Sequence, residues 1–309
     1  MRYYLAVDIG ASAGRHILAH IEGGKIIAEE IYRFSNTPEA LPGTPGALGC
    51  QGGKRLMWNA KRLFREILNG LKKAGELGKA PYSVGVDTWG VDYVLLDEKD
   101  EPIGGVYCYR DGRTKSAVAS VHRRVPFAEL YAKTGIQFQA FNTVYQLYDD
   151  KRTGRSAKAR SFLMLPDYFH FLLTGVKKQE YTNATTTGMV NALTHTWDEE
   201  IIEKLDYKRS GSASWLSRGR KRENLRRKWR RSSGIGQKSF CPPRTIRRAP
   251  FCRRRSRGRR RIFPAEPGRC WASSGTAPIR RTRRGSSTIP TRAASAAAFG
   301  SRKISWGFG

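Results

Sequence analysis

The sequence predicts an α/β fold over its first two thirds, and two observations support this. Short apolar runs come first and then alternate with amphipathic segments of helical spacing, which is typical of a sheet covered by helices. Residues 209–309 lack both patterns and hold about half of the 57 Lys and Arg, but only two of the 26 Asp and Glu. We therefore expect one α/β domain over residues 1–208 and a largely irregular or disordered tail over residues 209–309.

The first predicted elements are three strands and their turns. Tyr3–Asp8 is a short apolar run that predicts a buried strand, and a Gly-bearing turn follows at Ile9–Arg15. His16–His20 and Lys25–Arg33 predict the next two strands, joined by a turn that contains two glycines. Pro38–Lys54 is rich in Gly and Pro and predicts an irregular surface loop.

The later elements alternate between strands and helices. Apolar residues at helical spacing predict a helix with one buried face over Lys61–Leu71. The further predicted strands are Val84–Asp87, Tyr93–Leu96 and Val106–Tyr109. The further predicted helices are Ser116–Gly135, Asn142–Lys151 and Phe162–Thr174, the last begun near Pro166 and ended by Gly175. His170 in the last helix is expected to be a packed residue without a catalytic role.

Composition limits the possible classes of protein. The formal net charge of +31 indicates a nucleic-acid partner only if the whole chain is averaged, because the charge is concentrated in the tail. The five cysteines are scattered and show neither a pair nor a Cys/His cluster at zinc-ligand spacing, which favours reduced thiols in a cytoplasmic protein. No N-terminal signal sequence is recognisable, and no apolar run approaches the ~20 residues that a membrane-spanning helix needs.

The turn after the first strand is a candidate phosphate-binding loop. Its small residues let backbone N–H groups approach phosphate oxygens, and its Arg adds positive charge. Asp8, at the end of the strand, suits Mg²⁺ held through water, because Mg²⁺ prefers few carboxylates and several waters. The alternative is an ordinary hairpin turn. The candidate residues are Asp8, Gly10, Ala11, Ser12, Ala13, Gly14 and Arg15.

Three further loops carry candidate ligand contacts. Asp87–Tyr93 places two carboxylates and Trp89 between two strands, where they suit sugar hydroxyls and the C–H face of a sugar ring; the alternative is a turn with a packed Trp. Tyr107–Thr114 follows a strand and includes Arg110; the alternative is a surface ion pair. Glu180–Thr187 is a Thr- and Asn-rich loop that either lines a hydroxyl-rich pocket or caps a helix.

In this order and spacing, the motifs resemble those of the rhamnulokinases, which are FGGY-type carbohydrate kinases. The resemblance covers about Tyr3 to Tyr207. It rests on AVDIGASAGR, VGVDTWGVDYVLLD, YRDGRT, GIQFQAFNTVYQL, LMLPDYFHFLLTG and EYTNATTT. It implies the N-terminal domain of an actin/hexokinase-like (ribonuclease H-like) fold in which two α/β domains close on ATP and sugar.

The resemblance also implies a reaction and residue roles. The family transfers the γ-phosphate of ATP, with Mg²⁺, to the C1 hydroxyl of L-rhamnulose. Matched by motif, Ala11–Arg15 contact the ATP phosphates and Gly90 contacts the sugar. Residues near or at the sugar site are Asp87, Trp89, Asp92 and Arg110. The catalytic base of the family is an Asp in a His-Asp-Thr motif that opens the second domain, and this sequence contains no such motif.

The tail is interpreted as the product of a shifted reading frame that begins near Arg209. Read in the alternative frame, the codons of Phe240–Cys252 are compatible with VLPATHDTASAVL, and the missing Asp is then coded across Thr245 and Ile246. Ile262–Ser274 and Ile289–Gly309 likewise give motifs of the second domain, in the correct order. We therefore expect an inactive fragment of a kinase as the alternative to an active one. We do not expect nucleic-acid binding by the Arg-rich tail, although such segments bind phosphate backbones in a salt-dependent way.

Overall fold

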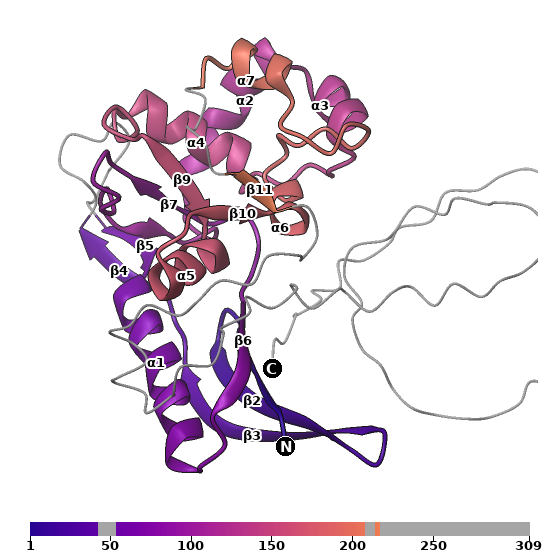
Figure 1. Ribbon diagram of the computed structural model, residues 1–309. Coiled ribbons are helices and arrows are strands. Elements are labelled where there is room, and N and C mark those ends of the chain that lie inside the picture. Colours follow the sequence, from indigo (N-terminus) through magenta and orange to yellow (C-terminus); the bar gives the residue numbers. More distant parts are fainter. Residues whose placement is uncertain (43–53, 208–213, 217–309) are drawn as a thin grey trace, which may run out of the picture. The chain divides into compact units, whose positions relative to one another are not determined.

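The computed structural model describes residues 1–42, 54–207 and 214–216 (Figure 1). The chain divides into two units, Met1–Arg253 and Arg254–Gly309, and all described residues belong to the first. Of the predicted tail, only β11 (Ser214–Leu216) is described. It is a short strand parallel to β10 (Lys178–Glu180), so these three residues are not irregular. The codons proposed for the missing Asp, at Thr245 and Ile246, lie outside the described residues.

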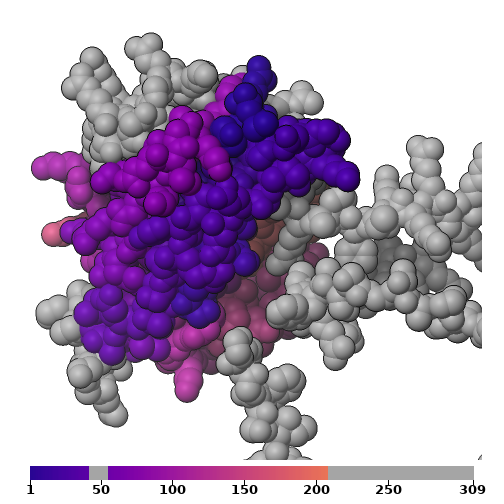
Figure 2. Space-filling model, turned by 90° about the horizontal axis from the view of Figure 1, so that it is seen from below, coloured from indigo at the N-terminus to yellow at the C-terminus, as the bar shows by residue number. Residues whose placement is uncertain are grey.

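The principal sheet has four strands in the order β3-β2-β1-β6. β1 (Tyr3–Ile9), β2 (Ala13–Glu22) and β3 (Lys25–Ser35) are consecutive and antiparallel, which confirms the predicted hairpins. β6 (Pro81–Asp87) lies parallel to β1 on its other side. Alternate residues of β1 are buried, as expected for a strand with one face on the core. Figure 2 shows that the N-terminal residues, indigo to purple, gather on one face of the molecule.

Helix α1 (Ala60–Glu76) directly precedes β6 in the chain, and two short strands come between β3 and this helix (Figure 1). Asn59 begins it, with its side chain accepting a hydrogen bond from the Arg62 amide at 3.0 Å. Its buried face packs in one apolar cluster with β1, β2 and β6. The members contributed by α1 are Leu63, Phe64, Ile67, Leu71 and Ala74. The predicted apolar face of Lys61–Leu71 is therefore confirmed, and the helix extends one turn further.

The rest of the described chain forms smaller sheets and helices. β7 (Tyr93–Leu96) pairs with β9 (Ser161–Met164), and β5 (Lys54–Trp58) lies between β4 (Glu39–Pro42) and β8 (Val106–Tyr107). A second apolar cluster joins β7 and β9 to helices α2, α3, α4 and α7. The helices are α2 (Lys115–Arg124), α3 (Phe127–Thr134), α4 (Thr143–Arg152), α5 (Leu165–Thr174), α6 (Tyr181–Thr185) and α7 (Glu199–Lys204), with a 3₁₀ turn at Gly112–Thr114.

Two predicted helices were wrong in extent. The helix predicted over Ser116–Gly135 is divided into α2 and α3 at Val125, which is extended with φ −133° and ψ 100°. Pro126 causes the break, because proline disfavours helical backbone in the residue before it. The helix predicted from Phe162 begins only at Leu165. The buried residues before it form β9, and Pro166 occupies the first turn of α5, as predicted.

The loop predicted over Pro38–Lys54 was also wrong in part. Glu39–Pro42 is a strand whose register places Glu39 opposite Met57. Its pairing partner is β5, which the sequence did not predict as a strand because KRLMW shows no alternation of polar and apolar residues. Residues 43–53 lie outside the described residues.

Within residues 1–42, 54–207 and 214–216, no helix is long and apolar enough to cross a membrane.

Candidate functional site

The turn between β1 and β2 is closed by hydrogen bonds and exposed at its tip. The Gly10 amide donates to the Ala13 carbonyl at 2.8 Å, and both Gly10 and Ser12 are exposed. Asn36 is buried and donates from its side chain to the Gly10 carbonyl, and from its amide to the Ser12 carbonyl, each at 2.8 Å. Sequence analysis missed Asn36, because its only signal is a polar residue following a strand. The turn is thus fixed by a residue outside it.

Gly14 is required by packing. A Cβ atom at this position would lie 2.1 Å from the Phe34 ring, far inside any real contact. A Cβ on Gly10 would lie 3.3 Å from the Ala13 carbonyl oxygen, which is tight but less severe. The structure therefore explains the glycine at position 14, the second residue of β2, by the Phe34 ring of β3.

Asp8 and Asp87 end two parallel strands at the same edge of the sheet. They are register partners between β1 and β6, and Arg15 is the partner of Asp8 on the other side. The Arg15 guanidinium makes an ion pair with the Asp8 carboxylate at 2.9 Å, with both side chains about half exposed. Two carboxylates beside an exposed turn fit Mg²⁺, which takes one or two protein carboxylates together with waters and phosphate oxygens. No cluster of three or more His, Cys, Asp and Glu suited to a metal occurs within the described part of the chain.

Asp92 is fully buried and accepts hydrogen bonds on both oxygens. Its Oδ2 accepts from the indole nitrogens of Trp58 at 2.7 Å and Trp89 at 2.8 Å, and from the Tyr109 amide at 3.1 Å. Its Oδ1 accepts from the Gln146 side chain at 3.2 Å. Burial raises the pKa of Asp92 to about 6, and the donated hydrogen bonds oppose that rise. The predicted sugar-site carboxylate therefore serves the protein's own donors.

Val91 lies in a strained turn beside it. Its φ is +66°, a region that β-branched residues rarely adopt, and the Asp92 amide donates to the Gly90 carbonyl at 2.9 Å to close a three-residue γ-turn. Such strain costs on the order of 1–3 kcal/mol and persists only where the surroundings enforce it. The Thr186 hydroxyl accepts a hydrogen bond from the Val91 amide at 3.0 Å, and the Thr143 hydroxyl donates to the Val91 carbonyl at 2.7 Å.

Gly90 faces Thr186 closely, since a Cβ at Gly90 would lie 2.9 Å from that side chain. Thr186 directly follows α6. Glu180 caps the start of that helix, because its carboxylate accepts a hydrogen bond from the Asn183 amide at 2.8 Å. Of the two alternatives for the Thr- and Asn-rich segment, the structure shows a helix cap at its start. Its end contacts the predicted sugar-binding turn.

Aromatic side chains surround this turn. The rings of Trp58 and Trp89 lie 4.2 Å apart between centroids, Tyr109 lies 6.4 Å from Trp58, and Phe141 lies 5.5 Å from Tyr109. Arg110 is exposed and lies over the Tyr109 ring at 5.5 Å. The geometry thus places a cationic side chain and a group of aromatic rings next to Gly90 and Asp92, which suits a polar ligand with an apolar face.

The loop that contains Arg110 is anchored by buried ions. Arg113 pairs with Asp150 at 2.8 Å and with Asp149 at 3.1 Å, and all three side chains are almost completely buried. Asp111 accepts from the Leu56 amide at 2.9 Å and so attaches the loop to β5. The alternative of a surface ion pair was therefore wrong for Arg113, because its carboxylate partners on α4 are buried with it.

His170 packs as predicted. Its Nε2 accepts a hydrogen bond from the Val86 amide at 3.3 Å, and burial lowers the pKa of the imidazole to about 4, so the ring is neutral near pH 7. It supports β6 from α5.

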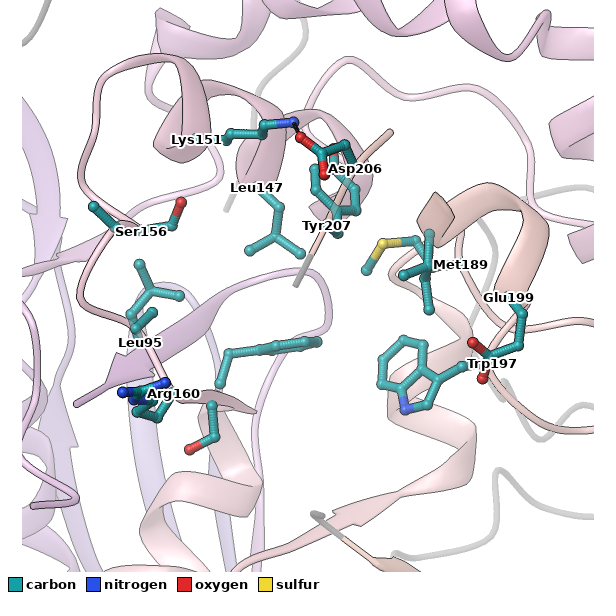
Figure 3. A pocket seen from close by; sticks show the side chains of 15 residues that line it. Leu95, Leu147, Lys151, Ser156, Arg160, Met189, Trp197, Glu199, Asp206 and Tyr207 are labelled. Atoms are coloured by element: carbon teal, nitrogen blue, oxygen red, sulfur yellow. Dashed lines mark hydrogen bonds and ion pairs between the residues drawn. The ribbon is translucent and has the colours of Figure 1, made fainter. Parts of the chain in front are cut away.

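A separate pocket of about 440 Å³ lies between β7, β9, α4 and α7 (Figure 3). Its walls are mainly apolar, and an ion pair between Lys151 and Asp206, 2.6 Å apart, lies at its edge. Leu95, Met189 and Trp197 point into it. None of the predicted site residues lines this pocket, so its shape does not contribute to the candidate site.

Comparison with known proteins agrees with the fold. The profile of the FGGY family of carbohydrate kinases, N-terminal domain, matches residues 3–235. The range runs past residue 208, and the domain boundary proposed there stays a prediction. The ligand-bound xylulose kinase from Lactobacillus acidophilus superposes with a TM-score of 0.66 at 20% identity, covering 78% of this chain and 47% of that one. Plasmodium falciparum glycerol kinase with ADP gives 0.63 at 12% identity, covering 78% and 48%. Both show a shared fold, which confirms the predicted fold class.

Curated relatives are more similar in sequence. The rhamnulokinase of Halalkalibacterium halodurans is 50% identical over 209 residues, which are 67% of this chain and 42% of that protein. The rhamnulokinase of Oceanobacillus iheyensis is 46% identical over 205 residues, or 66% and 41%. The chain spans about two fifths of the length of these relatives. With the profile match over most of its length, the chain belongs to the FGGY family of carbohydrate kinases.

Proposed function

We propose that this chain carries the sugar-binding part and first phosphate-binding loop of an L-rhamnulose kinase. The complete reaction transfers the γ-phosphate of ATP to the C1 hydroxyl of L-rhamnulose. The observation that carries the proposal is the sequence identity of 50% to a rhamnulokinase over 209 residues. Both candidate loops lie within residues 3–235, which match the N-terminal domain of the FGGY kinases. The in-register pairing of β1 with β6 supports it, because it brings the ends of these loops to one edge of the sheet.

The residue roles follow the motifs and the geometry. The exposed backbone of the Gly10–Ala13 turn, together with Arg15, would hold ATP phosphates, and Asp8 would hold Mg²⁺ through water. Gly90, Trp89 and Arg110 would contact the sugar, with Asp87 beside them at the end of β6 and Asp92 behind the indoles. When bound, Mg²⁺ supplies charge neutralisation of the phosphates, and the chain's own residues supply position.

Phosphoryl transfer also needs a base for the sugar hydroxyl. The 309-residue sequence contains no His-Asp-Thr motif of the kind that resemblance assigns to this role. We therefore propose that this polypeptide binds L-rhamnulose without turnover, and that reading the tail in the alternative frame restores the base.

Calorimetric titration of the 309-residue chain tests sugar binding. We expect L-rhamnulose to bind more tightly than D-xylulose, glycerol or gluconate. Trp89→Ala should abolish binding, whereas Trp197→Ala, in the separate pocket, should leave it unchanged. Equal binding of all four ligands would reduce the proposal to the family level, and absence of L-rhamnulose binding would overturn it.

A coupled ATPase assay tests turnover. We expect none from the 309-residue chain with L-rhamnulose and Mg-ATP, and turnover from a chain expressed with the frame corrected near codon 209. Turnover by the 309-residue chain itself would contradict the proposed loss of the base.

A further inference from the structure

The turn at Gly90–Asp92 is supported from α4 by one side chain, Gln146, which bonds to both Val91 and Asp92. Gln146 is 2% exposed. Its amide nitrogen donates to the Val91 carbonyl at 3.2 Å, to Asp92 Oδ1 at 3.2 Å and to the Phe141 carbonyl at 2.9 Å. A side-chain amide is suited to this role because it carries two N–H donors that are shared here among three acceptors.

The orientation of that amide is set from the opposite side. The Arg113 guanidinium donates to Gln146 Oε1 at 3.0 Å, so the oxygen faces the buried ion pairs and the nitrogen faces the turn. Arg113 is itself held by Asp149 and Asp150. A rotated amide would place two donors together and leave the Val91 carbonyl with fewer partners, so only one orientation satisfies the network.

Asp92 transmits this constraint to the aromatic rings. One oxygen of its carboxylate is held by Gln146, and the other accepts from the indoles of Trp58 and Trp89. The position of both indoles therefore depends on the carboxylate plane. Trp89 is partly exposed, whereas Trp58 is buried behind it.

We propose that Gln146 is a positioning residue for the sugar site, acting through Asp92 on the indoles of Trp58 and Trp89 and through the Val91 carbonyl on the Gly90 turn. This inference rests on the proposed function. The motif around Asp92 gives no sign of this partner, because Gln146 lies on α4, 54 positions further along the chain. Its contribution is to hold a strained turn and an aromatic wall in one arrangement before a ligand arrives.

The decisive variant is Gln146→Glu, which keeps the acceptor for Arg113 and replaces the two donors by a second carboxylate oxygen. In the 309-residue chain with ¹⁵N-labelled Trp, we expect the indole N–H resonances of Trp58 and Trp89 to shift. They are assigned by Trp58→Phe and Trp89→Phe. We expect the dissociation constant for L-rhamnulose to rise about tenfold or more, because small displacements of a positioned group are costly for binding.

Tyr145→Phe is the matched control. Tyr145 is equally buried on the same helix, and its hydroxyl shares a hydrogen bond with His122 at 2.8 Å that the variant lacks. Its side chain makes no hydrogen bond to Asp92 or to the turn. It should lower the midpoint of thermal unfolding without moving the two indole resonances or the affinity. If Gln146→Glu behaves in the same way as Tyr145→Phe, Gln146 is a core residue only and the proposal fails.

Thr143→Val keeps the test decisive if Gln146→Glu does not fold. It removes one hydrogen bond to the Val91 carbonyl and leaves Asp92 untouched. We expect weaker sugar binding with little change in the Trp58 resonance, and unchanged binding would contradict a role for the turn.

These measurements distinguish failure of the proposed function from failure of the positioning role of Gln146. Indole shifts in Gln146→Glu without L-rhamnulose binding by the wild type would overturn the function alone, and equal sugar affinity of wild type and variant would overturn the positioning role alone.

Discussion

The two candidate loops are built in opposite ways. The Gly10–Ala13 turn is exposed and is held mainly by backbone geometry and one buried residue, Asn36. The Gly90–Asp92 turn is largely buried, strained at Val91, and held by side chains from α4, the α6 region and β5. Under the proposed function, the first loop meets a charged and hydrated phosphate, for which backbone N–H groups suffice. The second loop would contact a neutral sugar, for which fixed side chains are needed, and these come from distant parts of the chain.

Replacing the buried Asp92 should change the free energy of unfolding more than replacing any residue of the first loop. Asp92→Ala removes the fully buried acceptor of two indole N–H groups and one amide, of which the Trp58 indole is buried, and this should reduce the free energy of unfolding by about 3 kcal/mol. Asp8→Ala removes a half-exposed ion pair and should change it by less than about 1 kcal/mol. Urea unfolding of both variants measures the difference. Similar losses in the two variants would show that the second loop is not the more tightly held one.

The pH dependence of stability sharpens the comparison. The pKa of Asp92 is raised from 3.8 to about 6 by burial, so the folded state binds this proton more tightly than the unfolded state. Its contribution to stability is therefore fully present below about pH 4 and is lost as the pH rises through 6, by up to about 3 kcal/mol.

Asp92→Asn removes this titration. The difference in unfolding free energy between wild type and variant should fall as the pH increases from 4 to 7, with the wild type becoming relatively less stable. Urea unfolding at intervals of one pH unit provides the measurement. Parallel profiles for the two proteins would mean that the carboxylate titrates alike in folded and unfolded chains.

A smaller effect is expected at the first loop. Gly14→Ala places a Cβ atom within 2.1 Å of the Phe34 ring and should cost about 1–3 kcal/mol through overpacking. Gly112→Ala is the control, because its Cβ would make only an ordinary contact at 3.7 Å. The double variant Gly14→Ala/Phe34→Leu should recover part of the loss. Thermal unfolding of the three proteins decides whether packing, and not ligand approach, requires Gly14.

Much of the first loop could be predicted from the sequence, because its elements are consecutive. The strands around Ile9–Arg15 show their own apolar patterns, and small residues mark the turn between them. The second loop was located by Asp87–Tyr93, but the roles within it were not evident. Nothing local to Asp92 shows that α4 and β5 supply its partners. Periodicity also failed to predict strand β4, which forms because β5 pairs with it, and the break before Pro126, which proline imposes on the residue before it.

The in-register pairing of β1 with β6 also restricts how this domain can vary in length. Successive residues of a strand point to opposite faces, so sliding β6 by one residue would turn Asp87 to the other side of the sheet while Asp8 stayed in place. One deleted residue inside either strand would therefore place the Asp8 and Asp87 carboxylates on opposite faces of the sheet, even if the fold were kept. Additions at Gly23–Gly24, at the far end of the hairpin, would leave that edge intact, so this turn is where the domain can best accept a tag or an inserted peptide.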